Sequence, residues 1–202
     1  MLHGSLTDDL IVAKLSHLKH QHPSFCFIDP LVIQEWRRYI QLDPSNLGSL
    51  DYHPLTDKFI GSVIYLNNNH WGVFFIDTTI HKAVLIDSMK RKENIAILEE
   101  IVDTFVWAFL DKSEPWEIEV WMAHETQIDA VSCGVRSLAY VEAILAERQG
   151  VSCCNRTFPT VTQHTIQSLR ERYTQEIFQG ESSLIREEFT YGGTPIRSPR
   201  FN

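Results

Sequence analysis

Two short segments in the middle of the chain are almost continuously apolar, and they constrain the fold more than any other feature. They cover residues 71–76 and 83–86, and the mostly polar residues 77–82 between them are typical of a hairpin turn. A strand with one face in water alternates apolar and polar residues, so a continuous apolar run predicts a strand that is covered on both faces. We therefore expect an antiparallel hairpin within a sheet that lies between helices.

Helical and extended patterns surround this hairpin. Apolar spacing predicts helices over residues 7–20, 30–40, 94–110, 134–146 and 163–178, and further strands over 25–28, 59–66 and 116–122. Residues 41–57 are predicted to form a loop. This order indicates an α+β fold with a central mixed or antiparallel sheet flanked by helices. We expect a single catalytic domain over residues 1–180 and a flexible tail over residues 181–202.

The composition argues against several classes of function. The chain has 26 acidic and 18 basic residues and a formal charge of −8, which argues against a nucleic-acid-binding protein with a basic surface. No apolar run approaches the ~20 residues of a membrane span, and residues 1–9 lack the regions of a signal peptide. The four cysteines fit neither a disulfide framework nor a zinc pattern. We expect a soluble monomer in a reducing compartment, without metal, cofactor, nucleic acid or membrane.

Cys133 is a candidate nucleophile. It lies between a polar loop, residues 127–132, and the apolar segment that is predicted to be a helix. The unpaired N–H groups and partial positive charge of a helix N-terminus favour thiolate over thiol. Gly134, the next residue, lets another chain approach the cysteine closely. Because a thiolate nucleophile needs a proton donor for its leaving group, we expect a histidine nearby.

His70 is the candidate for this histidine, because it stands where two apolar strands meet. Asp87 directly follows the last of these strands. In a tight antiparallel hairpin the start of one strand lies beside the end of the next, so Asp87 can reach His70 and fix its tautomer. Gln127 precedes Cys133 by six positions, where its amide can donate to a developing oxyanion together with the Cys133 N–H.

Each of these residues also has an ordinary structural interpretation. A cysteine at a helix start is usually a small buried apolar residue, and a histidine at a strand start usually packs or faces solvent. Gln127 can equally be an ordinary loop amide. His124 is a rival base, and Asp77 and Asp129 are rival acids. Taken one at a time, the residues leave the assignment open.

The order and spacing of these residues resemble those of one protein family. The residues in question are His70-Trp71, Ile86-Asp87-Ser88, Gln127 with Cys133-Gly134-Val135, and Leu6-Thr7-Asp8-Asp9-Leu10-Ile11. They resemble the His-Trp, Tyr-x-Asp-Ser and Gln-x5-Cys-Gly-Val blocks and the first helix of the ubiquitin-like-protein-specific cysteine proteases, the SUMO (sentrin) protease group. The adenovirus protease shares the order of the triad. The resemblance covers residues 5–145.

The resemblance implies a papain-like-clan cysteine protease whose circularly ordered triad runs His70, Asp87, Cys133 along the chain. In this family the cysteine attacks a carbonyl, the histidine acts as base and then as acid, and the aspartate orients the histidine. The resemblance also implies that Gln127 lines the oxyanion hole. It further implies that Trp71 lies over the narrow channel that admits the C-terminal glycines of the substrate. Gly134, which allows another chain close to the cysteine, is the second candidate substrate-binding residue.

The activity implied is that of a peptidase or isopeptidase that cleaves after the Gly-Gly of SUMO, ubiquitin or a related modifier through a thioester, without a cofactor. The modifier and its conjugated proteins are then the partners. The implied location is intracellular, nuclear or cytoplasmic, or a host cell for a delivered effector. Two alternatives stay open: an acetyltransferase of the related bacterial effector type, which forms a similar acyl-enzyme, and a non-catalytic module that binds a ubiquitin-like protein.

Two positions depart from the family pattern. Ser132 stands where the family usually has Asp directly before the cysteine, and Ser5 stands where it has a tryptophan that helps to clamp the di-glycine tail. These departures leave the triad chemistry intact. They leave the identity of the modifier open.

Overall fold

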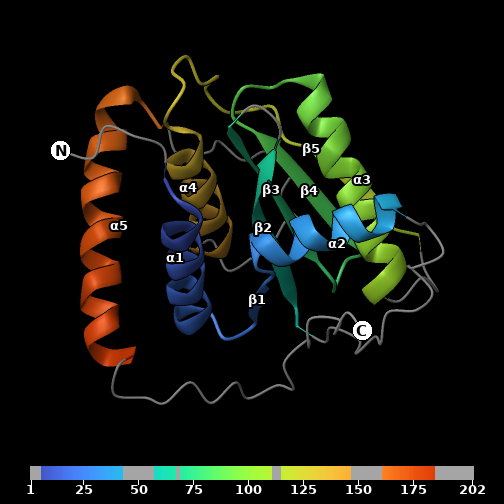
Figure 1. The fold of residues 1–202 in the computed structure, drawn as a ribbon, viewed down its shortest axis with the longest axis horizontal. Helices are drawn as coiled ribbons and strands as arrows, with labels where there is room; N and C mark the ends of the chain where they lie inside the picture. The colour runs from blue at the N-terminus through green and yellow to red at the C-terminus, as the bar shows by residue number, and fades with distance from the viewer. Residues whose placement is uncertain (1–5, 43–56, 67–68, 111–114, 147–160, 185–202) are drawn as a thin grey trace.

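The computed structural model describes residues 6–42, 57–66, 69–110, 115–146 and 161–184 of the 202-residue chain. Within these ranges a central sheet lies between two groups of helices (Figure 1). One group consists of α1 (Asp8–Gln21), α4 (Cys133–Ala146) and α5 (Gln163–Leu184), and the other of α2 (Pro30–Leu42) and α3 (Lys92–Phe109). The predicted arrangement of a sheet between helices is confirmed.

The sheet is mixed, with its strands in the order β1-β2-β3-β4-β5. The strands are β1 (Phe25–Phe27), β2 (Phe59–Leu66), β3 (His70–Asp77), β4 (Lys82–Asp87) and β5 (Glu117–Val120). The three central strands form an antiparallel meander, whereas each edge strand pairs in parallel with its neighbour. The predicted α+β class with a mixed sheet is therefore confirmed.

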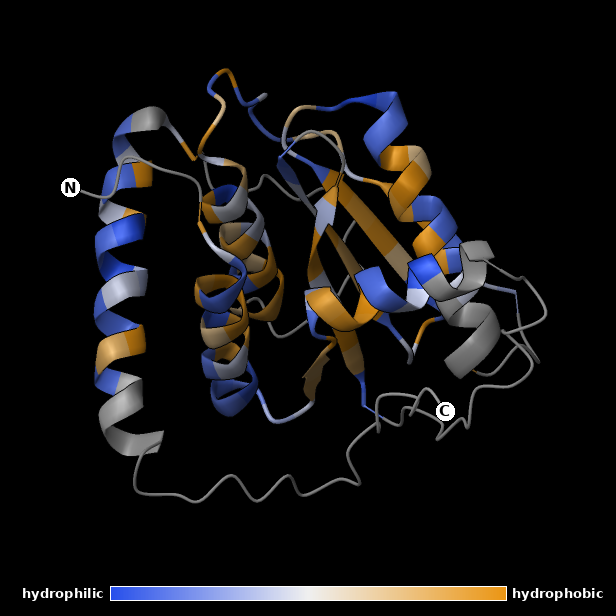
Figure 2. Cartoon of the chain, in the orientation of Figure 1, coloured by the Kyte–Doolittle hydropathy of each residue, from blue (hydrophilic) through white to orange (hydrophobic). Residues whose placement is uncertain are grey.

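The two central strands β3 and β4 are buried along their whole length. Trp71, Val73 and Phe75 of β3 belong to the apolar cluster that includes residues of α1, α4 and α5. Phe74 and Ile76 belong to the cluster on the α2 and α3 side. Because both faces of these strands are covered, the side chains on both faces are apolar. Strands β3 and β4 therefore form a hydrophobic centre (Figure 2).

Most predicted boundaries differ from the observed ones by at most two residues, and the differences at α5 and β5 have a physical reason. Helix α5 continues to Leu184, past the predicted helix end at residue 178, because a single glycine such as Gly180 costs a helix only ~1 kcal/mol. Strand β5 covers only Glu117–Val120 of the predicted 116–122 and lies at the edge of the sheet. Residues 185–202 and most of the predicted loop 41–57 lie outside the described residues.

Two negative observations hold for the five described ranges. None of their helices is both long and apolar enough to span a membrane. Their histidine, cysteine, aspartate and glutamate side chains form no group of three or more that could hold a metal ion.

Candidate active site

The ends of three elements define the candidate site: β3 begins at His70, β4 ends at Asp87 and α4 begins at Cys133. Gly72 of β3 pairs with Asp87 of β4, and His70 lies two residues before Gly72 on the same face of the strand. This diagonal relation brings the two side chains together. His70 Nε2 lies 2.5 Å from Asp87 Oδ1, so the contact follows from the register of the hairpin.

The Asp87 carboxylate is buried and accepts hydrogen bonds on both oxygens. Besides His70, Oδ1 accepts the Met89 N–H at 3.1 Å, and Oδ2 accepts the Arg91 N–H at 2.7 Å and Asn94 Nδ2 at 3.1 Å. Burial raises the pKa of this carboxyl, but the hydrogen bonds from His70 and the two main-chain N–H groups hold the pKa below its usual range. An ionised Asp87 fixes the orientation of the imidazole.

Asn94 is a part of this site that the sequence analysis missed. It is buried near the start of α3, on the same face as Leu98 and Ile101. Among these apolar neighbours, its side-chain amide donates a hydrogen bond to Asp87. A polar residue on the apolar face of a predicted helix is a signal that it has a buried partner, and this signal was available in the sequence.

Cys133 is 1% exposed, and its thiol and the His70 imidazole shift each other's pKa. Burial raises the pKa of the thiol, but His70 and the main-chain N–H groups of Trp71 and Gly134 lower it, to a value below that of an ordinary thiol. Burial lowers the pKa of His70, but hydrogen bonds with Asp87 and Cys133 raise it to about 9. Because Asp87 occupies Nε2, Nδ1 is left for Cys133. These shifts favour a thiolate beside an imidazolium, the reactive state of a cysteine nucleophile.

Gln127 is buried and fixed to the residue after Asp87. Its N–H donates to the Ser88 carbonyl at 2.7 Å, and its Oε1 accepts the Ser88 hydroxyl at 2.6 Å. Its Nε2 donates to the Asp129 carbonyl at 2.6 Å. The second Nε2 hydrogen has only a 3.5 Å contact with Asp129 Oδ1, so a substrate oxygen can compete for it. The Gln127 side chain thus joins the segment after β4 to the loop before α4.

The rival residues occupy other places. Asp77 lies at the opposite end of β3, where it accepts the N–H and hydroxyl of Thr79 in the hairpin turn. His124 is buried beside Tyr140, with ring centroids 5.2 Å apart, and burial lowers its pKa. Asp129 binds the loop before α4, as described below. These positions favour the contacting His–Asp pair over the rivals.

No family model and no curated protein matches the sequence, but solved structures match the fold. The SUMO protease Ulp1 matches with a TM-score of 0.62 at 14% identity, over 90% of this chain and 80% of that one. XopD of Xanthomonas campestris, bound to ubiquitin, matches with a TM-score of 0.58 at 20% identity, over 85% of this chain and 91% of that one. ChlaDub1 from Chlamydia trachomatis matches with a TM-score of 0.59 at 11% identity, over 86% of this chain and 92% of that one. The chain has the fold of the ubiquitin-like-protein-specific cysteine proteases.

At Ser132, where the chain departs from the usual sequence of these cysteine proteases, Asp129 supplies a carboxylate to the same loop. Asp129 Oδ1 accepts the N–H groups of Val131 and Ser132 at 2.8 and 2.7 Å, and Oδ2 accepts the Ser132 hydroxyl at 2.7 Å. Arg136 Nε donates to that hydroxyl at 3.2 Å. Burial raises the pKa of Asp129, but its bonds with Ser132 and Val131 lower it overall. Asp129 therefore organises the turn before α4.

Trp71 and Gly134, the predicted substrate contacts of the protease fold, pack against each other. A Cβ at Gly134 would come within 3.2 Å of Trp71 Cδ1 and of Leu6 Cβ, so a side chain there would require these neighbours to move by a few tenths of an ångström. Trp71 is 2% exposed and meets Tyr65 edge-on, with ring centroids 5.1 Å apart. Both residues line the core below Cys133, and their contact with a substrate stays a prediction.

Proposed function

We propose that the chain is a cysteine peptidase or isopeptidase that cleaves after the C-terminal Gly-Gly of a ubiquitin-like modifier. The buried contact between His70 and Asp87, beside Cys133 at the start of α4, carries this proposal. The fold supports it: Ulp1 is a SUMO protease that has been solved in complex with SMT3, the yeast SUMO orthologue, and XopD has been solved bound to ubiquitin. The proposed partners are the modifier and its conjugated proteins.

In the first step the Cys133 thiolate attacks the carbonyl carbon of the last glycine. The negative charge that develops on the carbonyl oxygen is held by the Cys133 N–H and the free Nε2 hydrogen of Gln127. The His70 imidazolium gives its proton to the leaving nitrogen, the carbon–nitrogen bond breaks, and the amine departs. The modifier is then held as a thioester on Cys133.

In the second step His70, now neutral, takes a proton from water while the water oxygen attacks the thioester carbon. The carbon–sulfur bond breaks, the modifier leaves as a carboxylic acid that gives its remaining proton to solvent, and the thiolate and imidazolium are restored. Asp87 keeps the imidazole in one orientation throughout and stabilises its positive charge. A free thiol is kept reduced in the cytosol and nucleus, so we propose action inside a cell, either its own or that of a host.

The test is a reaction of the purified chain with SUMO, ubiquitin and related modifiers that carry an electrophile at the C-terminus. We expect a covalent adduct with at least one modifier, lost in Cys133→Ala and strongly reduced in His70→Ala. Cys26→Ala is the matched control, because Cys26 is a half-buried cysteine in β1 with a free thiol and a raised pKa, caused mainly by burial. We expect this control to react like the wild type.

Two outcomes would contradict the proposal. An adduct that persists in Cys133→Ala would remove Cys133 as the nucleophile. Absence of any adduct from folded wild-type protein would instead favour the acetyltransferase or the non-catalytic binding module, and an acetyl-donor assay would separate these two.

A further inference from the structure

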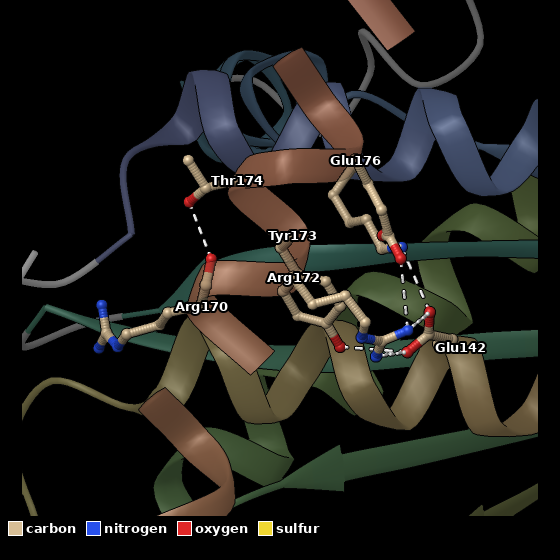
Figure 3. Close-up of polar contacts among 7 residues, drawn as sticks. Glu142, Arg170, Arg172, Tyr173, Thr174 and Glu176 are labelled. Carbon is tan, nitrogen blue, oxygen red and sulfur yellow. Dashed lines mark hydrogen bonds and ion pairs between the residues drawn. The ribbon is translucent and has the colours of Figure 1, made fainter. Parts of the chain in front are cut away.

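Helix α5 is mostly hydrophilic, yet it is firmly attached to α1 and α4 through a cluster of charges (Figures 2 and 3). Lys14 of α1 is 0% exposed and forms ion pairs with Glu142 of α4, at 3.2 Å, and with Glu176 of α5. Arg172 of α5 also pairs with Glu142, at 2.5 Å, and Tyr173 donates to it at 3.3 Å. We call these five residues the docking cluster.

Arg170 belongs to the same helix but points away from the docking cluster (Figure 3). It is 6% exposed, and its Nη2 donates to the main-chain carbonyl of Val131 at 2.7 Å. Val131 stands two residues before Cys133. A hydrogen bond from a charged, buried donor to a carbonyl oxygen is stronger than one between neutral groups.

The peptide groups before Cys133 are thus held from two sides. Asp129 binds the N–H groups of Val131 and Ser132, and Arg170 binds the carbonyl of Val131. Burial lowers the pKa of Arg170, while the negative charges of Asp129 and Cys133 act in the opposite direction, so all three charges are near one another. Cys133 follows this turn directly, and its N–H is the predicted oxyanion donor.

We propose that Arg170 of α5 is a positioning residue for Cys133. It binds the Val131 carbonyl and thereby holds the turn 129–132 in place. This inference rests on the proposed function. Without the guanidinium, the Val131 carbonyl loses its charged donor, and the Cys133 N–H and thiolate lose a fixed position. An error of ~1 Å at reacting atoms can cost ~100-fold in rate. Because Arg170 is buried and donates to the main chain of the turn, we expect the binding of the modifier to change little.

The experiment compares Arg170→Met, which removes the charge, and Arg170→Lys, which keeps it, with Arg172→Met as the matched control on the same helix. Turnover of the modifier substrate found above gives kcat and KM. Alkylation of Cys133 by iodoacetamide across pH, followed on the Cys133 peptide by mass spectrometry, gives the acidity of the thiol without any substrate. Thermal unfolding reports whether each variant is folded.

For Arg170→Met we expect kcat to fall about tenfold with KM almost unchanged, and the alkylation midpoint to move to higher pH. Arg170→Lys should be intermediate, and Arg172→Met should keep the wild-type kcat and midpoint. Wild-type kcat and midpoint in folded Arg170→Met would overturn the inference, as would an equal loss in Arg172→Met. If Arg170→Met does not fold, Arg170→Lys decides by the same criteria. An ordinary thiol midpoint in the wild type would instead contradict the proposed function itself.

Discussion

Two of the places where the described residues bury charge, the candidate site and the docking cluster, differ in what the charge can do. In the candidate site, Cys133 and His70 have pKa values that shift toward each other's range, so a proton can move between them. In the docking cluster, Lys14 and Arg172 face Glu142 and Glu176. The docking cluster contains no thiol–imidazole pair, and its charges act as ion pairs between helices.

The two sites also differ in how their partners are brought together. His70 and Asp87 are neighbours within one hairpin and are positioned by strand register. The docking cluster combines three helices, and it is the position of these helices that aligns its charges. A loss in the candidate site should therefore affect the rate, and a loss in the docking cluster should affect the stability.

The largest expected effect is that of Asp87→Asn on the rate. The amide cannot stabilise an imidazolium and favours the wrong tautomer of His70, so we expect kcat to fall ~1000-fold or more. Steady-state turnover measures kcat, and circular dichroism checks the fold. A loss of less than about tenfold would mean that Asp87 supports the hairpin only.

Lys14→Met should mainly affect the free energy of unfolding. It removes the buried cation that contacts both Glu142 and Glu176 and leaves them with the more exposed Arg172, and we expect a loss of about 2–3 kcal/mol, with kcat unchanged in the folded protein. Urea denaturation measures it. Arg172→Met, whose side chain is 43% exposed, should cost under ~1 kcal/mol. Equal losses in the two variants would show that burial of the ammonium does not matter.

The pH dependence of the wild type should report on the candidate site, both in the rate and in the stability. The lowered pKa of Cys133 and the pKa of about 9 for His70 predict a bell-shaped kcat/KM, which declines above pH 9 as the imidazolium loses its proton. Since the folded pKa of His70 is raised, its contribution to stability is full below ~6.5 and is lost as the pH rises through about 9. Initial rates and urea denaturation across pH measure both effects.

In Asp87→Asn the alkaline limb of kcat/KM should move to lower pH, because the variant loses an interaction that raises the pKa of His70. An alkaline limb at the same pH in both proteins would assign it to another group.

Ser88→Ala should have the smallest effect. The Ser88 hydroxyl orients Gln127 by a single hydrogen bond, whose loss costs ~1 kcal/mol, or about fivefold in kcat. The main-chain bond between the same residues remains, so stability and KM should change little. A wild-type kcat in this variant would argue against Gln127 as an oxyanion donor.

The features that follow from local patterns could be predicted from the sequence. Strand β2 has the predicted bounds, 59–66, because its mostly apolar residues form one uninterrupted segment between polar residues. The contact of His70 with Asp87 could be predicted because a short loop joins the two strands of the hairpin, and loop length fixes which residues pair across it. The start of α4 at Cys133 follows from the change from a polar loop to an apolar helix.

The contacts between distant segments could not be predicted in this way. Lys14 and Glu176 are 162 positions apart, and Arg170 and Val131 are 39 apart. Their meeting depends on how α5 packs beside α1 and α4, and helical spacing does not determine the position of one helix against another. Asp129 shows the same limit on a smaller scale: its capping bonds depend on the conformation of the loop.

The contact between Arg170 and Val131 has a consequence for the order of synthesis. Translation runs from the N-terminus, so a nascent chain that has reached Ala146 already contains His70, Asp87 and Cys133 but not Arg170. Until α5 is made and docks, the Val131 carbonyl and the buried Lys14 lack partners that the folded protein provides. An incomplete chain would therefore carry a reactive thiol on a turn that is not yet fixed, and competence would come only after residue 176 has been added and α5 has docked.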